Sequence, residues 1–502
     1  MTRRVETVID AMQSPFLFQR WFKDDSTWTA WRAFLAALFA LGMDDKALAV
    51  YRACTGRETP PSSPVAEAWL VVGRRGGKSF ILALCAVYLA LFRDWRPHLT
   101  PGERGVVMVI ARDRSQAKVI LGYVKALLTE VPALALHVER TTAETVDLVG
   151  SISIEVHTAS FRSIRGRTVI CGLCDELAFW NSEDSAEPDA EILAALRPSM
   201  ATVPGAMLLC ASSPYARRGA LYRAYRDHHA KDSSVLVWKA DTRTMNSTVP
   251  EALIAKAYED DPSSAAAEYG ALFRSDIESF IAREAVESCV VAGRRELPPL
   301  RAIQYRAFVD PSGGSSDSMT LAIAHLEKER IVIDAIRDRT PPFSPESVVD
   351  EFASLLKAFR VSSVVGDRYA GEWPRERFRR SGIQYLPSAA PKSALYRDML
   401  PALNSGQVEL LDHPKLINQV CNLERRTARG GRDSIDHPPQ QHDDLANAAA
   451  GVISICRKPK RHGPRVSRLE SPGDEHRRRI GLSEGARAWD GSGNFGDWLR
   501  NG

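Results

Sequence analysis

A glycine-rich turn between two apolar segments constrains the fold of this chain more than any other feature. Residues 68–72 (AWLVV) form a short apolar run, residues 72–79 (VGRRGGKS) follow it, and residues 80–92 form a longer apolar run. A buried strand, a tight loop and a helix in this order are typical of α/β proteins that bind phosphate. The sequence therefore predicts an α/β fold with a phosphate-binding loop after its first strand.

The residue types in this loop suit a nucleoside triphosphate. Gly76 and Gly77 let the backbone turn where a side chain would collide with a phosphate. Lys78 would reach the β- and γ-phosphates, and the Ser79 hydroxyl would bind Mg²⁺ at the positive end of a helix. The residues expected to bind ATP with Mg²⁺ are Gly73, Arg74, Arg75, Gly76, Gly77, Lys78 and Ser79.

The loop departs from the usual pattern at one position. Val72 stands five residues before Gly77, where a glycine is usual, and Gly73 follows it. Gly-Lys-Ser alone also occurs by chance, so the loop needs support from a second motif. Arg74 and Arg75 either direct positive charge toward the phosphates or simply face solvent.

The second motif is an apolar run that ends in two acids, VICGLCDE over residues 169–176. In a parallel sheet this places both carboxylates at the edge where ligands bind. Asp175 would hold Mg²⁺ through water, and Glu176 would act as the general base for the hydrolytic water. The alternative is two solvated acids at a strand end. Their position about a hundred residues after the phosphate loop favours an ATPase.

Two further groups of residues are candidates for roles in ATP hydrolysis. Arg165, between Arg162 and Arg167, is the candidate for an arginine finger that reaches the γ-phosphate. These arginines are alternatively surface or DNA-phosphate contacts. Ser212 and Ser213 follow another apolar run, where a hydroxyl could sense the γ-phosphate and couple hydrolysis to movement; the alternative is a plain turn.

Composition indicates a protein of several domains. With 502 residues the chain is too long for one compact domain, and about two or three are expected. Strands and helices alternate through the first half. We expect a helical N-terminal segment (1–60), a P-loop ATPase core with a mainly parallel sheet (61–250), a helical linker (251–300), a second α/β domain (301–456) and a basic, disordered tail (457–502).

The same counts limit the classes of protein to which the chain can belong. The net charge of +4 is small, so any nucleic-acid-binding surface must be local. The apolar run over residues 80–92 is shorter than the roughly 20 residues of a membrane span, and no signal-peptide core precedes it. We therefore expect a cytoplasmic protein. Cys171 and Cys174 have zinc-ligand spacing but lie in an expected buried strand without a second pair.

Three acidic positions, widely separated in the second half, form a pattern typical of a metal-dependent nuclease. Asp310 and Asp367 each follow an apolar strand, and Asp443 and Asp444 begin an alanine-rich helix. Strand end, strand end and helix start is the order found in ribonuclease-H-like nucleases. Such carboxylates bind two divalent metals, Mg²⁺ or Mn²⁺, that activate water and stabilise the leaving oxygen. Each acid alone would be dismissed as a turn residue. Which of the two adjacent acids faces the metals stays open, and Asn447 is a weaker candidate ligand.

Taken together, these motifs resemble the large terminase subunit of tailed bacteriophages and prophages over most of residues 10–455. The resemblance rests on the following segments: GRRGGKS (73–79), LCDE (173–176), ASSP (211–214), DPSGG (310–314), GDRY (366–369) and HDDL (442–445). It implies an additional-strand P-loop ATPase domain and a ribonuclease-H-like nuclease domain. It also implies that the protein pumps double-stranded viral DNA into a procapsid and cuts the concatemer. The implied partners are the portal protein, a small terminase subunit and a homo-oligomeric ring, usually a pentamer, in the host cytoplasm.

Two other functions fit parts of the pattern. A DNA helicase or repair ATPase fused to a nuclease would carry both constellations, but its further helicase motifs are not evident. A DNA-binding assembly factor with an inactive nuclease half would not need the complete set of acids.

Overall fold

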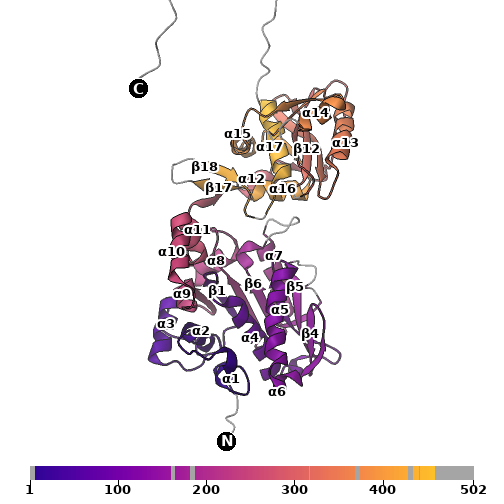
Figure 1. Ribbon diagram of the computed structural model, residues 1–502. Helices are drawn as coiled ribbons and strands as arrows, with labels where there is room; N and C mark the ends of the chain where they lie inside the picture. The colour runs from indigo at the N-terminus through magenta and orange to yellow at the C-terminus, as the bar shows by residue number, and fades with distance from the viewer. Residues whose placement is uncertain are drawn as a thin grey trace, which may run out of the picture. The chain divides into compact units, whose positions relative to one another are not determined.

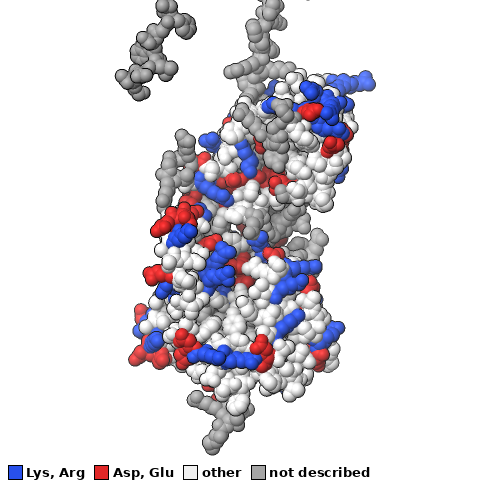
Figure 2. All heavy atoms as spheres, viewed as in Figure 1, with Lys and Arg blue, Asp and Glu red and all other residues white. Residues whose placement is uncertain are grey.

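The computed structural model describes residues 6–159, 164, 166–180, 187–315, 317–367, 373–427, 433–439 and 441–457 (Figure 1). Arg162, Arg165 and all but the first residue of the expected tail lie outside these ranges. Within them, no helix combines the length and the apolar character needed to cross a membrane. On the face shown in Figure 2, basic and acidic side chains are intermixed, in keeping with the small net charge.

The first half of the chain forms an eight-stranded sheet in the order β3-β4-β5-β2-β6-β7-β1-β8. The strands from β5 to β8 in this order are parallel, and β3 and β4 add an antiparallel edge. The bounds are β1 Glu67–Val72, β2 Gly105–Ala111, β3 Val138–Thr141, β4 Thr145–Leu148, β5 Ile152–Thr158, β6 Thr168–Asp175, β7 Met207–Ser212 and β8 Val235–Ala240. Because β7 lies between β1 and β6, the sheet has the additional strand that the resemblance predicts.

Helices cover both faces of this sheet. Successive residues of β2, β6 and β7 are buried, which requires packing on each side. Cys171 and Cys174 are both buried free thiols in β6, as predicted. The main helices are α1 Val8–Gln13, α2 Thr29–Leu38, α3 Asp45–Thr55, α4 Lys78–Phe92, α5 Arg114–Thr129, α6 Pro132–Ala135, α7 Pro188–Met200 and α8 Gly219–His228, with 3₁₀ turns at Gln19–Trp21, Arg96–His98 and Leu177–Phe179.

A seven-stranded sheet in the order β10-β16-β13-β12-β11-β14-β15 forms the second half. Its centre has an antiparallel β11-β12-β13 meander, and β14 and β15 continue it parallel to β11. This is the strand order of the ribonuclease-H-like fold, as predicted. The bounds are β10 Val290–Val291, β11 Tyr305–Asp310, β12 Met319–Glu327, β13 Arg330–Arg339, β14 Ser363–Gly366, β15 Gln384–Pro387 and β16 Val408–Leu411.

Alternate residues of the central strands belong to two apolar clusters, one on each face of this sheet. Phe308 and Ala322 pack with α15 and α17, whereas Val309 and Leu321 pack with α13. A Cβ at Gly451 of α17 would lie 2.3 Å from Phe308, so this glycine brings the helix close to β11. The helices are α12 Arg283–Glu287, α13 Pro345–Ala358, α14 Trp373–Arg380, α15 Lys392–Asn404, α16 Pro414–Cys421 and α17 Asp444–Arg457.

The segment between the two sheets differs in part from its predicted helical structure. It contains α9 Thr242–Met245, α10 Glu251–Asp260 and α11 Pro262–Glu268, and also β9 Ile277–Ser279 and the strand β10. β9 pairs with β17 Glu424–Thr427, which pairs with β18 Asp433–Asp436 in a three-stranded sheet. Both short strands are specified by partners more than a hundred residues away, so no local periodicity marks them.

Candidate functional site

The phosphate loop is held in a fixed conformation between β1 and α4. Gly77 has φ +96° and Arg75 has φ 64°, so the chain turns sharply before the helix. The indole N–H of Trp31, in α2, donates to the Gly76 carbonyl at 2.8 Å. A Cβ at Gly73 would lie 2.4 Å from the Thr242 hydroxyl, so this position requires glycine although it is displaced from the usual pattern.

Lys78 lies inside the loop, with its side chain 4 % exposed. Its ammonium donates to the Val72 carbonyl at 3.0 Å and lies 3.4 Å from the Glu176 carboxylate. In this arrangement the lysine is enclosed by the loop backbone and by the predicted general base. A phosphate group bound in the loop would lie next to this positive charge.

Ser79 and Asp175 form a pair suited to a metal ion. The Ser79 hydroxyl donates to one Asp175 oxygen at 3.1 Å, and the other oxygen is buried without a hydrogen-bond partner among the described residues. Burial and the neighbouring Glu176 raise the pKa of the Asp175 carboxyl well above its usual range. An orphaned, buried carboxylate oxygen beside a hydroxyl fits the Mg²⁺ of a bound nucleotide.

Glu176 joins the predicted coupling serines to the nucleotide site. Its backbone adopts φ 49°, which turns the residue out of β6. Its carboxylate accepts from the Ser212 hydroxyl at 3.1 Å and from the Ser213 backbone N–H at 3.3 Å. The structure therefore brings Lys78, Glu176 and both serines together at the same edge of the sheet.

The arginines near this site are placed differently from one another. Arg74 pairs with Glu268 of α11 at 3.1 Å, and the Arg75 carbonyl accepts from the Asn246 side chain at 2.9 Å. Arg167 pairs with Glu155 at 2.6 Å. Arg165 lies outside the described residues, so its role as an arginine finger stays a prediction. Arg74 thus connects the loop to α11, a contact that no local motif marks.

The acids of the second half also converge. Asp310 ends β11 and Asp367 follows β14, its parallel neighbour. The Asn447 side-chain amide of α17 donates to Asp310 at 2.8 Å and to Asp367 at 2.7 Å, so it bridges the two carboxylates. Burial, together with the negative charge of Asp367, raises the pKa of Asp310 well above its usual range. Burial also raises the pKa of Asp367.

The two adjacent acids at the start of α17 have different surroundings. Asp443 is buried and accepts from the Tyr396 hydroxyl at 2.7 Å and from the Lys392 ammonium at 2.9 Å. Asp444 accepts from the Ser318 backbone N–H at 3.2 Å. Burial and the adjacent Asp443 raise the pKa of Asp444 to about 6. Lys392 and Tyr396 were not anticipated, because only the fold brings α15 to this site.

These residues offer the oxygen donors that a divalent-metal centre uses. Their charges repel one another in a partly buried position, and only one amide separates Asp310 from Asp367. The carbonyl oxygen of that Asn447 amide is buried and lacks a hydrogen-bond partner among the described residues. Clustered hard oxygen donors suit Mg²⁺ or Mn²⁺, and a bound cation would relieve their repulsion.

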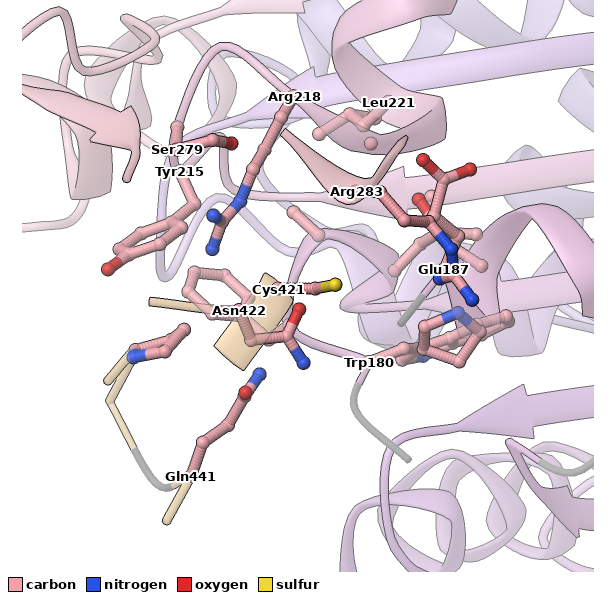
Figure 3. Close-up of a pocket in the computed structure, with 18 of the residues that line it drawn as sticks. Trp180, Glu187, Tyr215, Arg218, Leu221, Ser279, Arg283, Cys421, Asn422 and Gln441 are labelled. Atoms are coloured by element: carbon pink, nitrogen blue, oxygen red, sulfur yellow. The ribbon is translucent and has the colours of Figure 1, made fainter. Parts of the chain in front are cut away.

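The loop after β7 also contacts the three-stranded sheet. Around a cavity of about 340 Å³, Figure 3 shows Tyr215 and Arg218 from this loop near Asn422 and Gln441. Beside the cavity, the fully buried Glu424 of β17 accepts from the Tyr215 hydroxyl at 2.9 Å and from Arg218 at 2.5 Å. The loop that follows the two serines predicted to couple hydrolysis to movement therefore contacts the sheet that ends at Asp436.

We expect Glu424→Gln to lower the free energy of unfolding by about 2 kcal/mol, since it leaves both Arg218 and Arg426 facing a buried neutral amide. Urea denaturation of the purified protein measures this loss as a lower urea concentration at the midpoint of the first unfolding transition. The control Glu130→Gln removes an exposed pair with Arg20, and we expect less than about 1 kcal/mol there. Equal midpoints for the two variants would contradict the assigned contact.

No known family model and no curated protein matches the sequence. Solved structures similar to the chain include the large terminase of bacteriophage HK97, at 16% identity over 78% of this chain and 91% of that one, with a TM-score of 0.35. The large terminase of the thermophilic bacteriophage D6E in complex with ADP is 13% identical over 80% and 97%, with a TM-score of 0.35. The large terminase nuclease of the thermophilic phage G20c with bound magnesium is 16% identical over 35% and 96%, with a TM-score of 0.31.

Proposed function

We propose that the chain is a large terminase subunit, an ATPase that drives double-stranded viral DNA into a procapsid and an endonuclease that cuts the concatemer. The observation that supports this proposal is that the candidate residues of each predicted site lie close together in the fold. One group combines the phosphate loop with Asp175 and Glu176; the other gathers separated carboxylates at the edge of a ribonuclease-H-like sheet.

In the ATPase site, each side chain has a distinct task. Lys78 would exchange the Val72 carbonyl for β- and γ-phosphate oxygens, and Ser79 with Asp175 would hold Mg²⁺. The ion supplies charge neutralisation on the phosphates when bound. Glu176, released from Lys78, would accept a proton from the attacking water. Ser212 and Ser213 contact the Glu176 carboxylate. When Glu176 leaves Lys78 for the attacking water, these contacts would therefore change, and with them the position of the loop after β7.

In the nuclease site, Asp310, Asp367 and one or both of Asp443 and Asp444 would hold two divalent metals, Mg²⁺ or Mn²⁺. Bound ions supply an activated water and charge at the leaving oxygen of the phosphodiester. Asp443 is buried, and Asp310, Asp367 and Asp444 are partly buried, which limits the access of bulk water to them. Asn447 would orient Asp310 and Asp367 toward the same point.

The proposed activity implies partners and a domain organisation. The proposed partners are double-stranded DNA, the portal protein of the procapsid, a small terminase subunit and further copies of the chain in a pentameric ring, in the host cytoplasm. The proposed domains are a helical segment (1–60), an ATPase core (61–250), a linker (251–300), a nuclease domain (301–456) and a basic tail (457–502). Arg165 is proposed as the arginine finger of this ring.

Displacement of a third strand from a DNA triplex tests the motor function. The purified chain should displace the third strand from double-stranded DNA when ATP and Mg²⁺ are present, because a translocating motor removes bound obstacles. Glu176→Gln should bind ATP but fail to displace the third strand, since the general base is lost. A forked duplex is the control, because a helicase would separate its strands and a packaging motor would not. Strand separation without triplex displacement would favour the helicase alternative.

A further inference from the structure

Beside the nuclease carboxylates lies a second group of metal-type ligands that already contains a cation. Ligand atoms of Asp436, His437 and Asp443 all lie within 4.8 Å of one another. The Lys392 ammonium lies among them, 2.8 Å from Asp436 and 2.9 and 3.1 Å from the two Asp443 oxygens. A side chain of the protein thus already supplies a positive charge within the group that resembles a metal site.

The helix α15 holds this cation in place. Lys392 and Tyr396 are four residues apart and therefore lie on the same face of the helix. The Tyr396 hydroxyl donates to Asp443 at 2.7 Å, and its ring is fully buried. Both oxygens of Asp443 are consequently engaged by α15. Asp310, Asp367 and Asp444 accept only neutral N–H donors from the described residues.

We propose that Lys392 is the fixed cation of the nuclease site: it occupies the Asp436–His437–Asp443 group in place of a divalent ion and holds Asp443 as its counter-ion, so that Asp310, Asp367 and Asp444 bind the metals. This inference rests on the proposed nuclease function, and it decides between the two adjacent acids of α17. It makes Lys392 and Tyr396 positioning residues for that reaction.

A fixed ammonium at this position could assist phosphodiester cleavage by presenting a positive charge to a DNA phosphate. Lys392 is 31% exposed at its side chain, so its charge is accessible from the solvent side of the site. The three N–H donors of the ammonium face the three carboxylate oxygens of Asp436 and Asp443, so Lys392 would act on a DNA phosphate through its charge and not through a hydrogen bond. This positive charge would reduce the repulsion between the DNA backbone and the surrounding carboxylates.

The test counts Mn²⁺ ions by titration calorimetry on the full chain without nucleotide, in an Asp175→Asn background that removes the ATPase metal pair. Lys392→Met should bind one more Mn²⁺ per chain than the parent, because Asp436, His437 and Asp443 lose their cation. Adding Asp436→Asn to Lys392→Met should abolish the extra ion. Lys392→Arg should bind the same number as the parent, since a guanidinium preserves the charge.

Cleavage of plasmid DNA gives the second readout. Lys392→Met should cut at least about tenfold more slowly, and Lys392→Arg should stay within about threefold of the parent, as expected for an electrostatic role. Asp444→Asn should weaken Mn²⁺ binding, whereas Asp443→Asn should leave the Mn²⁺ affinity of the remaining acids within about threefold.

An unchanged Mn²⁺ count in Lys392→Met, or a loss of Mn²⁺ affinity in Asp443→Asn equal to that in Asp444→Asn, would overturn the inference. The proposed nuclease would then still stand if Asp310→Asn removes Mn²⁺ binding and cleavage. If Asp310→Asn changes neither quantity, the proposed function itself fails, and the two failures are thus distinguishable.

Discussion

Lys78→Ala is expected to reduce ATP turnover at least about 100-fold, because it removes the one buried cation of the phosphate loop. The ammonium lies 3.4 Å from Glu176 and within the loop, so no neighbouring side chain among the described residues replaces its charge at this point. Steady-state release of phosphate from ATP measures the loss. Metal-dependent DNA cleavage should remain within about twofold of the wild-type rate, since the acids of that site lie on the other sheet.

The matched control is Lys256→Ala, which removes an exposed lysine from α10. Its ATP turnover should equal that of the wild type. Retained turnover in Lys78→Ala would contradict the assignment of the phosphate loop, whatever the cleavage assay shows.

Asp310→Asn is expected to abolish metal-dependent cleavage, with a loss of about 1,000-fold or more. The substitution keeps the shape of the side chain but removes a negative charge from the centre of the carboxylate group. Asn is a poor ligand for Mg²⁺ and Mn²⁺ compared with a carboxylate, so the metals and their activated water are lost. Linearisation of supercoiled plasmid with Mg²⁺ or Mn²⁺ measures the rate.

Asp350→Asn provides the control in the same domain, because Asp350 is a surface acid paired with Arg377. Its cleavage should match the wild type. The ATPase of Asp310→Asn should also be unchanged. Undiminished cleavage by Asp310→Asn would show that the carboxylate group is not the nuclease centre.

Much of the fold can be predicted from local patterns in the sequence. Continuous apolar runs such as those of β2 and β6 are typical of strands buried on both faces, and the glycines of the phosphate loop mark where β1 meets α4. Asp175, Asp310 and Asp367 end apolar runs, so their place at a sheet edge follows from the strand itself. These features are local, and the structure confirms them.

Contacts between distant segments could not be predicted in the same way. Trp31 supports the phosphate loop from α2, and Lys392 with Tyr396 reaches Asp443 from α15. Glu424 is buried by partners from the other half of the chain. Each of these residues looks ordinary in its own neighbourhood, because its role depends on a tertiary approach that periodicity does not encode. The short strands β9 and β10 were missed for the same reason.

The central claim is that one chain carries two separable sites. The most direct test measures both activities in the wild type and in one variant of each site. ATP turnover and plasmid cleavage are followed in parallel preparations of the wild type, Lys78→Ala and Asp310→Asn. We expect Lys78→Ala to lose only ATP turnover and Asp310→Asn to lose only cleavage. Loss of both activities in either correctly folded variant, or of neither activity in both variants, would contradict the account.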